Sequence, residues 1–225
     1  MNNSKPVIAI LGGTGQLGTG LARRWLQAGY TLIIGSRDLE KAEQAVADLR
    51  NVLAERGISS ADVQAMDNCS AAECASIVTL CVPFSHQEST LQSVKAMLEG
   101  KILIDVTVPL VPPKVARVQL PDQGSAGQIA QLLLGDGVDV VSAFQNVPAP
   151  HLKEDGPLDC DVLVCGNNKE ARAAVIELAE AAGMRAFHAG PIQNAAAVEA
   201  MTSVLIFINK QYKSHAGVRI TGVDT

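Results

Sequence analysis

A glycine-rich turn near the start of the chain constrains its fold more than any other feature. The segment 7–11 is a short apolar run, and Gly13, Gly15 and Gly18 follow it in the spacing G-x-G-x-x-G. A helical pattern begins at Gln16, directly within the turn. In this context the first glycine permits a tight turn, the second lets the backbone approach a pyrophosphate, and the third allows close packing of helix on strand. The turn therefore predicts a dinucleotide site.

Short apolar runs alternate with helical patterns along the rest of the chain. Such runs suit strands buried on both faces of a parallel sheet, and their alternation with helices predicts a doubly wound α/β fold. The expected strands are 7–11, 31–34, 76–82, 102–106, 138–142, 162–165 and 185–187, and the expected helices are 16–28, 39–56, 86–98, 125–134, 169–182 and 194–212. We expect a Rossmann-type domain at 1–148 and a small C-terminal α/β domain at 149–225.

Local signals fix some boundaries of these elements. Gly29 suits the left-handed position after the first helix, and Asp38 can cap the second. Three prolines between residues 109 and 113 predict a loop there. The final helix carries an apolar stripe, which predicts core or dimer packing: Val198, Met201, Leu205, Ile208 and Tyr212.

Composition excludes several classes of function. A net charge of -5 and an aromatic content of 3% argue against nucleic-acid binding. The apolar runs at 7–11 and 76–82 are far shorter than the roughly 20 residues of a membrane span, and the start of the chain does not resemble a signal peptide. Five cysteines without a C-x-x-C pair, and no histidines at metal-ligand spacing, predict reduced thiols, no metal site and a cytoplasmic protein.

The end of the second expected strand indicates which dinucleotide binds. An NAD enzyme normally carries an acidic residue there for the ribose 2′-hydroxyl, whereas this chain has Ser36 and Arg37, with Lys41 one turn into the next helix. A hydroxyl and a guanidinium suit a 2′-phosphate. Solvated surface charges and a helix cap are the alternative. We interpret the pattern as NADP(H) binding.

The nicotinamide should lie near the segments 82–86 and 107–109, which follow two central strands. His86 is the histidine placed there as a candidate acid, and the alternative is a polar residue that opens a helix. No Ser/Tyr/Lys set and no carboxylate pair at dehydrogenase spacing is present. Hydride exchange between two organic cofactors needs mainly stacking and distance control, and it suits such a site better than carbonyl reduction.

Several motifs together resemble one enzyme family. They are ILGGTGQLGTGLARR, IIGSR with Lys41, VPFSH, VVSAFQNVPA, Val164–Gly166, HAGPIQNA and HAGVRITG. In this order, over almost the whole chain, they resemble the NADPH-dependent coenzyme F420 reductases, also called F420H2:NADP oxidoreductases. The resemblance implies reversible hydride transfer between C4 of the nicotinamide and C5 of an 8-hydroxy-5-deazaflavin.

The resemblance also implies roles for individual residues. It places Thr14, Gln16 and Leu17 in the nucleotide turn, and Val82 and Pro83 on the nicotinamide side. It places the deazaflavin against Gln145, Asn146 and Val147, with Thr202 and the C-terminal tail nearby. Some relatives have His-Thr where this chain has Gln145-Asn146, so an amide would replace that histidine; a turn that caps a strand is the alternative for both residues.

The C-terminal segment 215–225 carries the cation Arg219. A deazaflavin with an anionic phosphate and glutamyl tail needs cationic donors outside the nucleotide pocket, and Arg219 could supply one. The alternative is an edge strand that seals the core or a dimer contact. We expect a homodimer. Two other functions remain open at this point: a small NADPH-dependent reductase of a metal ion, flavin or imine, and a non-enzymatic NADPH-sensing module.

Overall fold

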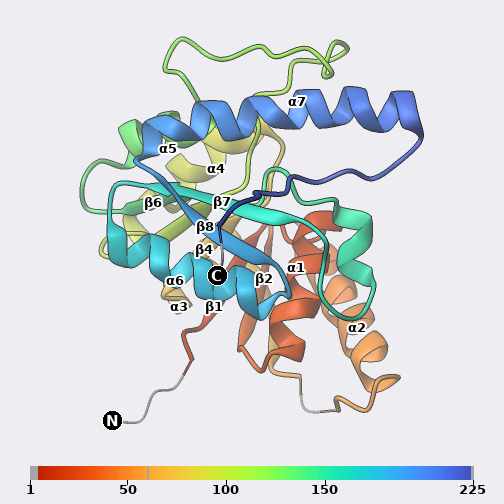
Figure 1. The fold of residues 1–225 in the computed structure, drawn as a ribbon. Coiled ribbons are helices and arrows are strands. Elements are labelled where there is room, and N and C mark those ends of the chain that lie inside the picture. The colour runs from red at the N-terminus through yellow and green to blue at the C-terminus, as the bar shows by residue number, and fades with distance from the viewer. Residues whose placement is uncertain (1–4, 60, 224–225) are drawn as a thin grey trace.

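Eight strands form one mostly parallel sheet in the order β3-β2-β1-β4-β5-β6-β7-β8 (Figure 1). The computed structural model describes residues 5–59 and 61–223, so residues 1–4, 60 and 224–225 of the predicted domains lie outside it. All pairs are parallel except β6 with β7. The strands are β1 Ile8–Leu11, β2 Leu32–Ser36, β3 Val63–Asp67, β4 Ile77–Leu80, β5 Ile102–Asp105, β6 Asp139–Ser142, β7 Asp161–Gly166 and β8 Arg185–Gly190. The predicted doubly wound fold is confirmed.

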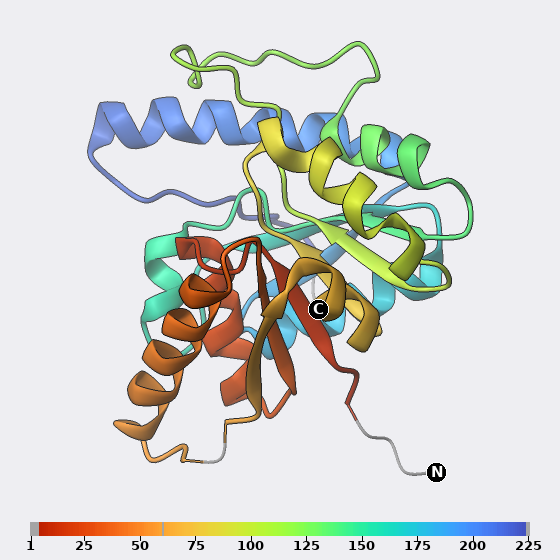
Figure 2. The same ribbon diagram turned by 180° about the vertical axis from the view of Figure 1, so that it is seen from behind.

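Helices cover both faces of the sheet and enclose two hydrophobic cores. The first core lies under α1 (Gln16–Gln27), α2 (Leu39–Ala54) and α6 (Lys169–Ala181), and the second under α3 (Asn68–Cys74), α4 (Gln87–Val94) and α5 (Ala126–Leu134). The long helix α7 (Ala195–Tyr212) packs beside α5 (Figures 1 and 2). The 3-10 helices are η1 Phe84–His86, η2 Lys95–Met97, η3 Ala149–Lys153 and η4 Ile192–Asn194.

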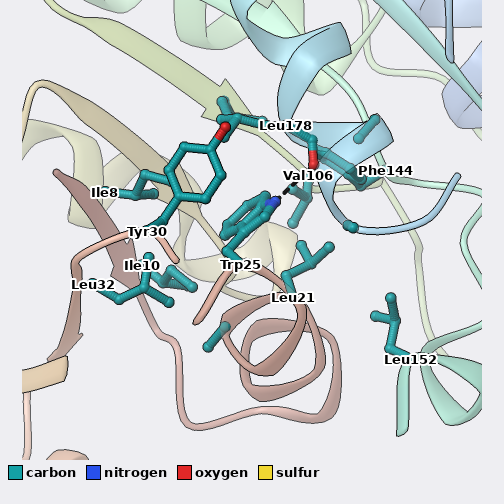
Figure 3. Packing of buried hydrophobic residues seen from close by; sticks show 14 of the residues in the cluster. Ile8, Ile10, Leu21, Trp25, Tyr30, Leu32, Val106, Phe144, Leu152 and Leu178 are labelled. Carbon is teal, nitrogen blue, oxygen red and sulfur yellow. Dashed lines mark hydrogen bonds between the residues drawn. The ribbon is translucent and has the colours of Figure 1, made fainter. Parts of the chain in front are cut away.

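Trp25 of α1 joins the first half of the chain to the second (Figure 3). Its ring is fully buried and meets Phe144 edge-to-face, with ring centroids 5.9 Å apart. Its indole N–H donates to the carbonyl of Leu178 in α6 at 2.8 Å. A buried indole needs such an acceptor because its unpaired N–H would cost free energy. The helix that follows the glycine turn is therefore fixed both to the turn after β6 and to α6.

The C-terminal unit continues the same sheet. The predicted boundary at Pro148 lies between β6 and β7, where the pairing changes from parallel to antiparallel. The unit β7-α6-β8 adds two parallel strands, and the chain then returns through α7 so that Val218 lies beside the start of β7. The backbone N–H of Asp161 donates to the carbonyl of Val218 at 2.7 Å. A segment near the C-terminus thus hydrogen-bonds the start of β7.

Two predicted boundaries are confirmed. Gly29 has a φ of 78°, the left-handed conformation expected after α1, and the Asp38 side chain accepts from the backbone N–H of Lys41 at the start of α2. The stretch after Pro109 forms no helix or strand until α5, as the prolines predict.

Three details of the predicted elements are wrong. Strand β3 and helix α3 were not expected, because β3 is an edge strand with mixed exposure and α3 has only 7 residues. Neither gives a long periodic signal. The helix expected at 86–98 is shorter, since α4 ends at Val94 and a 3-10 turn follows. The remaining expected elements lie within a few residues of the observed ones.

The apolar stripe on α7 is only partly core. Val198 and Leu205 are buried, whereas Met201 is 40% and Tyr212 is 74% exposed. The segment Ile192–Tyr212 is also long and apolar enough for a membrane span by length and composition alone, with a mean hydropathy of 1.2. Here it packs on α5, and a third of its apolar window is buried. The expectation that apolar segments fall far short of a span does not hold for this helix.

Candidate active site

A cleft of about 300 Å³ opens where the strand order reverses, between the carboxyl ends of β1 and β4. Ligands of doubly wound folds bind in the crevice at this switch point. Its walls come from the turn after β1, the end of β2, the start of α3 and the segment after β4. The lining residues are Gly12, Thr14, Gly15, Ser36, Arg37, Asp38, Lys41, Asn68, Cys81, Val82, Pro83 and His86.

The glycine turn combines two different requirements. Gly12 has a φ of 70°, and a Cβ there would lie 2.6 Å from Cγ1 of Val82, so the left-handed turn residue is Gly12 rather than Gly13. Gly13 is needed because a Cβ would lie 2.8 Å from the carbonyl oxygen of Ile10. A Cβ on Gly18 would lie 2.8 Å from Cα of Gly13, which explains the close packing of helix on turn.

Gly15 differs from the other glycines of the turn. Its φ is -79° and the nearest heavy atom to a methyl group added there would be 4.0 Å away, so the protein itself places no restriction on a side chain at this position. Gly15 faces the cleft, next to the first N–H groups of α1, which have no acidic cap. Free N–H groups at a helix start attract anions. The space beside Gly15 is therefore suited to a pyrophosphate.

The end of β2 brings three predicted phosphate ligands to one rim of the cleft. Ser36 is buried and its Oγ accepts from the backbone N–H of Asp38 at 3.1 Å. Arg37 is exposed and has no ion pair among the described residues. Lys41 contacts the carboxylate of Asp38 at 3.2 Å, and hydrogen bonds from Lys41 lower the pKa of Asp38. Arg37 is thus the free cation of this rim.

Asn68 also lines the cleft, although the sequence did not single it out. It is the first residue of α3 and is only 8% exposed. Its Oδ1 is buried without a hydrogen-bond partner in the described part of the chain, and it faces Gly35 at the end of β2. A buried amide without partners costs free energy unless a ligand supplies one. The signal could not be found in sequence because it depends on the unexpected β3 and α3.

The other end of the cleft is formed by the segment after β4. Val82, Pro83 and His86 line it, and the backbone N–H of His86 donates to the carbonyl of Pro83 in η1. His86 is half-buried and precedes Gln87, whose Nε2 donates to Asp105 at 2.5 Å and to Thr107 at 3.0 Å. The hydrogen bonds of Gln87 therefore fix the start of α4, next to His86, to the segment that ends β5.

Gln145 and Asn146 point into the protein rather than toward the cleft. Nε2 of Gln145 donates to the carbonyl of Asp105 and to Oγ of Ser142, each at 2.8 Å. Nδ2 of Asn146 donates to Oγ1 of Thr202 at 3.1 Å, and that hydroxyl donates to the carbonyl of Gln145. The structure brings these three predicted residues together, but as a tie between β5, β6 and α7. The Oε1 of Gln145 is buried and has no partner in residues 5–59 and 61–223.

The segment that carries these amides has a strained start. Phe144 has a φ of 71°, in the left-handed region that a bulky side chain rarely adopts. Its ring is held by Trp25, and Val147 is buried directly after the amides. Strained backbone of this kind concentrates at functional sites. The turn 144–147 is therefore held in one shape by its surroundings.

Arg219 is placed in an ion-pair cluster away from the cleft. Its Nη1 contacts Asp159 at 2.6 Å and its Nε lies 3.8 Å from Asp161. Asp161 is fully buried and also binds Arg185 at 2.8 Å and the N–H of Ile220 at 2.6 Å. The neighbouring Gly217 packs on Cys160 and Pro148, so the tail does approach the turn after β6. The cation itself already has partners.

Two fully buried carboxyl groups, those of Asp105 and Glu199, lie outside the lining of the cleft. Burial raises the pKa of Asp105 and raises the pKa of Glu199 to about 8. Glu199 of α7 accepts from the backbone N–H groups of Ala126 and Gly127 at 2.7 and 3.0 Å, so it caps α5 from another helix. Burial thus favours the protonated form of Glu199, while the two backbone donors favour the ionised form.

The five cysteines are free thiols. Within residues 5–59 and 61–223, no group of three or more His, Cys, Asp or Glu side chains is arranged to hold a metal ion. The groups that the cleft offers to a ligand are backbone donors, apolar walls and the polar side chains of Ser36, Arg37, Lys41, Asn68 and His86.

Comparison with known proteins follows this geometry. Residues 7–109 match the family model described as NADP oxidoreductase, coenzyme F420-dependent. The F420-dependent NADP reductase of Methanocaldococcus jannaschii is 43% identical over 223 residues, which cover 96% of this chain and 99% of that protein. The enzyme of the same name from Methanothermobacter marburgensis is 41% identical over 96% of this chain and 98% of its own. A crystal structure of a candidate F420-dependent NADP reductase from Arthrobacter sp. FB24 has the same fold, with a TM-score of 0.77, 24% identity and coverage of 94% and 96%.

Proposed function

The chain belongs to the family of F420-dependent NADP reductases, and we propose that its cleft binds NADP(H) between β1, β2 and β4 and brings the nicotinamide to Val82 and Pro83. It is an oxidoreductase that exchanges hydride between NADP(H) and coenzyme F420. When both are bound, C4 of the nicotinamide and C5 of the deazaflavin give and accept the hydride. The observation that carries the proposed site is the open space at Gly15 beside unpaired donors.

The residues of the cleft fit NADP(H). The turn Thr14–Leu17 offers backbone N–H groups to the pyrophosphate, with Gly18 holding α1 close. Arg37 is free to bind the 2′-phosphate, and Ser36 and Lys41 lie beside it. The Oδ1 of Asn68, which is buried beside Gly35 and has no partner among the described residues, would accept a hydrogen bond from the adenosine end. The carboxylate of Asp38 repels an anion at this rim and pairs with Lys41. Arg37 therefore contributes more to binding of the 2′-phosphate than Lys41 does.

The protein's own task in hydride transfer is to fix distance and exclude water. We propose that Val82 and Pro83 form the apolar wall at the nicotinamide, and that the turn Gln145–Val147 forms the wall for the deazaflavin. Gln145 is a positioning residue in this wall, because its amide hydrogen-bonds both β5 and β6. Thr202 and Asn146 fix the same turn to α7. His86, the last residue of η1, is the candidate proton donor near the deazaflavin ring.

The proposed homodimer would use the exposed face of α7. Met201, Val204 and Phe207 are exposed by 40%, 43% and 59% at helical spacing. The segment at 111–120 adds exposed apolar side chains, and Ser203 of α7 contacts the carbonyl of Arg117 in it. A second copy would bury both surfaces by two-fold symmetry. Phe207→Glu should convert a dimer to a monomer in light scattering, and a wild-type monomer would refute this assignment.

Free thiols support the proposal of a cytoplasmic protein.

A spectroscopic experiment tests the function directly. Purified protein with NADPH should abolish the visible absorbance of F420, and NADP+ added to reduced F420 should restore it. NADH, free flavin and a ferric chelate serve as controls. Reduction of flavin or ferric iron without reduction of F420 would contradict the function, and equal rates with NADH and NADPH would contradict the role of Arg37.

A further inference from the structure

A second and larger cavity, of about 710 Å³, lies between α1, α2 and η3. We call it the α1–α2 groove. It extends along α2 from Lys41 to Arg56, which is about 20 Å at the helical rise of 1.5 Å per residue. Its lining residues are Thr14, Thr19, Gly20, Arg23, Lys41, Gln44, Ala45, Asp48, Leu49, Val52, Arg56 and Lys153. The nucleotide cleft does not account for this space.

Positive charge predominates in the α1–α2 groove. Arg23, Lys41, Arg56 and Lys153 line it, against the single carboxylate of Asp48. Asp155 forms ion pairs with both Arg23 and Arg56, and Asp38 forms one with Lys41, so the charges of these three cations are offset. Lys153 stands on the rim, is exposed, and has no ion pair or hydrogen bond from its side chain among the residues that the structure describes. The groove therefore attracts an anion at its open end.

The groove also contains a buried donor that lacks a partner. Arg23 is only 4% exposed; its Nη groups bind η3 and Asp155, while its Nε is buried without an acceptor in the described residues. Beneath it Ala45, Leu49 and Val52 of α2 form an apolar floor. Cations above apolar side chains suit an elongated ligand in which methylene groups alternate with carboxylates.

The α1–α2 groove joins the nucleotide cleft. Thr14 and Lys41 line both cavities. On the other side, η3 directly follows the turn 145–147, and Leu152 of η3 packs on α1 so closely that a Cβ on Gly20 would lie 2.7 Å from it. Figures 1 and 2 both show η3 beside α1. A ligand that leaves the nicotinamide end past residue 147 would reach the groove along η3.

We propose that the α1–α2 groove binds the anionic tail of coenzyme F420, with the unpaired Lys153 as its cation and the floor of α2 under its methylene groups. This inference rests on the proposed function. It replaces Arg219 as the cation for the tail, because Arg219 is occupied by Asp159 and Asp161. The phosphate and the γ-linked glutamates of the tail supply the alternating charges and methylenes that the groove fits.

The test compares two deazaflavins, namely F420 and the deazaflavin riboside that lacks the phosphate and glutamates. Lys153→Glu should raise the KM for F420 about tenfold or more, since one charge-assisted contact is lost and a repulsion is added. The KM for the riboside and the KM for NADPH should change less than twofold. In the wild type the preference for F420 over the riboside should shrink as salt is raised.

A matched control and a second variant make the outcome decisive. Lys169→Glu changes an exposed lysine of α6 outside the groove and should not alter the ratio of the two KM values. Ala45→Leu adds bulk to the floor of the groove and should lower the affinity for F420 selectively. Equal changes for F420 and the riboside, or a changed KM for NADPH alone, would overturn the proposal. A wild type that reduces neither deazaflavin would instead contradict the proposed function.

Discussion

The turn after β1 and the turn after β6 treat their polar groups in opposite ways. Around the first, Arg37 has no ion pair, the Asn68 amide has no partner and Gly15 borders empty space, within the described residues. Around the second, Asn146 and Thr202 bind each other and Nε2 of Gln145 binds β5 and β6, so that of these amide groups Oε1 of Gln145 is left without a partner in the described residues. Polar groups left free recognise a charged ligand, whereas polar groups bound internally fix the shape of a surface.

This difference matches the chemistry of two substrates that exchange a hydride. A dinucleotide has a pyrophosphate and a 2′-phosphate, which need donors and a cation. A deazaflavin ring needs a flat apolar wall at a fixed distance. The strained Phe144, held by Trp25, keeps the second turn in place for that purpose.

Gly15→Ala should give the largest effect on the first turn. The methyl group meets no protein atom closer than 4.0 Å, so the fold and the melting temperature should be kept, while contacts to the pyrophosphate are lost. Each lost charge-assisted hydrogen bond costs about 1.5 to 3 kcal/mol, so the loss of two of them should lower NADPH affinity at least about 100-fold in a titration. Gly12→Ala is the contrasting variant, because its Cβ would clash with Val82 and its φ is positive, and it should lose stability as well. Retained NADPH affinity in Gly15→Ala would contradict the site.

Arg37→Ala should have the next largest effect. Loss of a charge-assisted contact to the 2′-phosphate costs about 1 to 3 kcal/mol of NADPH binding, while NADH, which lacks that phosphate, should bind as before. Equilibrium titrations with both nucleotides measure this contrast. If both affinities fell together, Arg37 would contact the shared pyrophosphate instead, and the free cation at the end of β2 would not explain NADP(H) selection.

Glu199 tests the internally bonded region through pH. Burial raises its pKa to about 8 from an ordinary value of 4.5, so the folded protein holds a proton that the unfolded chain releases. Glu199 alone should therefore make the free energy of unfolding fall as pH rises from about 5 to 8, by at most about 1.4 kcal/mol per pH unit. Asp105 shifts in the same direction and adds to the slope.

Chemical denaturation at several pH values checks this expectation. Glu199→Gln keeps the shape of the side chain and should reduce the slope, leaving the part due to Asp105. Glu177→Gln, an exposed glutamate of α6, is the control and should leave the slope unchanged. A wild-type stability that rises over this range would show that Glu199 is ionised in the folded state.

Sequence patterns predicted the first turn better than the second for a physical reason. Gly13, Gly15, Gly18, Ser36 and Arg37 lie next to the strands whose ends form the cleft, so short-range spacing was enough. Gln145 binds the carbonyl of Asp105, 40 residues away, and Arg219 binds Asp159, 60 residues away. No local pattern contains those partners. The buried strands were predicted from continuous apolar runs, and β3 was missed because an edge strand lacks one.

Asn68→Ala should weaken NADPH binding less than Gly15→Ala or Arg37→Ala does. If the free amide binds the adenosine end, its loss should weaken NADPH binding by about 1 kcal/mol, or roughly fivefold. Stability should change little, since the amide makes no hydrogen bond in the described structure that would be lost. Asn51→Ala, an exposed asparagine on α2, is the matched control. Unchanged NADPH affinity would mean that the unpaired amide has no part in recognition.

Arg219→Ala should have the smallest effect. Its contact with Asp159 is exposed, and such pairs contribute about 0 to 1 kcal/mol. The buried Asp161 keeps Arg185 and the N–H of Ile220 when Arg219 is removed, so the carboxylate that loses its partner is the exposed Asp159. The KM for F420 should therefore stay within twofold of the wild-type value, with the free energy of unfolding lower by under about 1 kcal/mol.

Arg185→Ala is the companion variant for this prediction. It removes the bidentate partner of Asp161, whose side chain is fully buried, and should destabilise the protein more than Arg219→Ala does. The order of the two losses in denaturation shows which arginine supports the C-terminal unit. A several-fold rise in the KM for F420 in Arg219→Ala, at unchanged stability, would instead show that Arg219 binds the tail of F420. A cation with internal ion pairs would then also recognise a ligand, contrary to the comparison of the two turns.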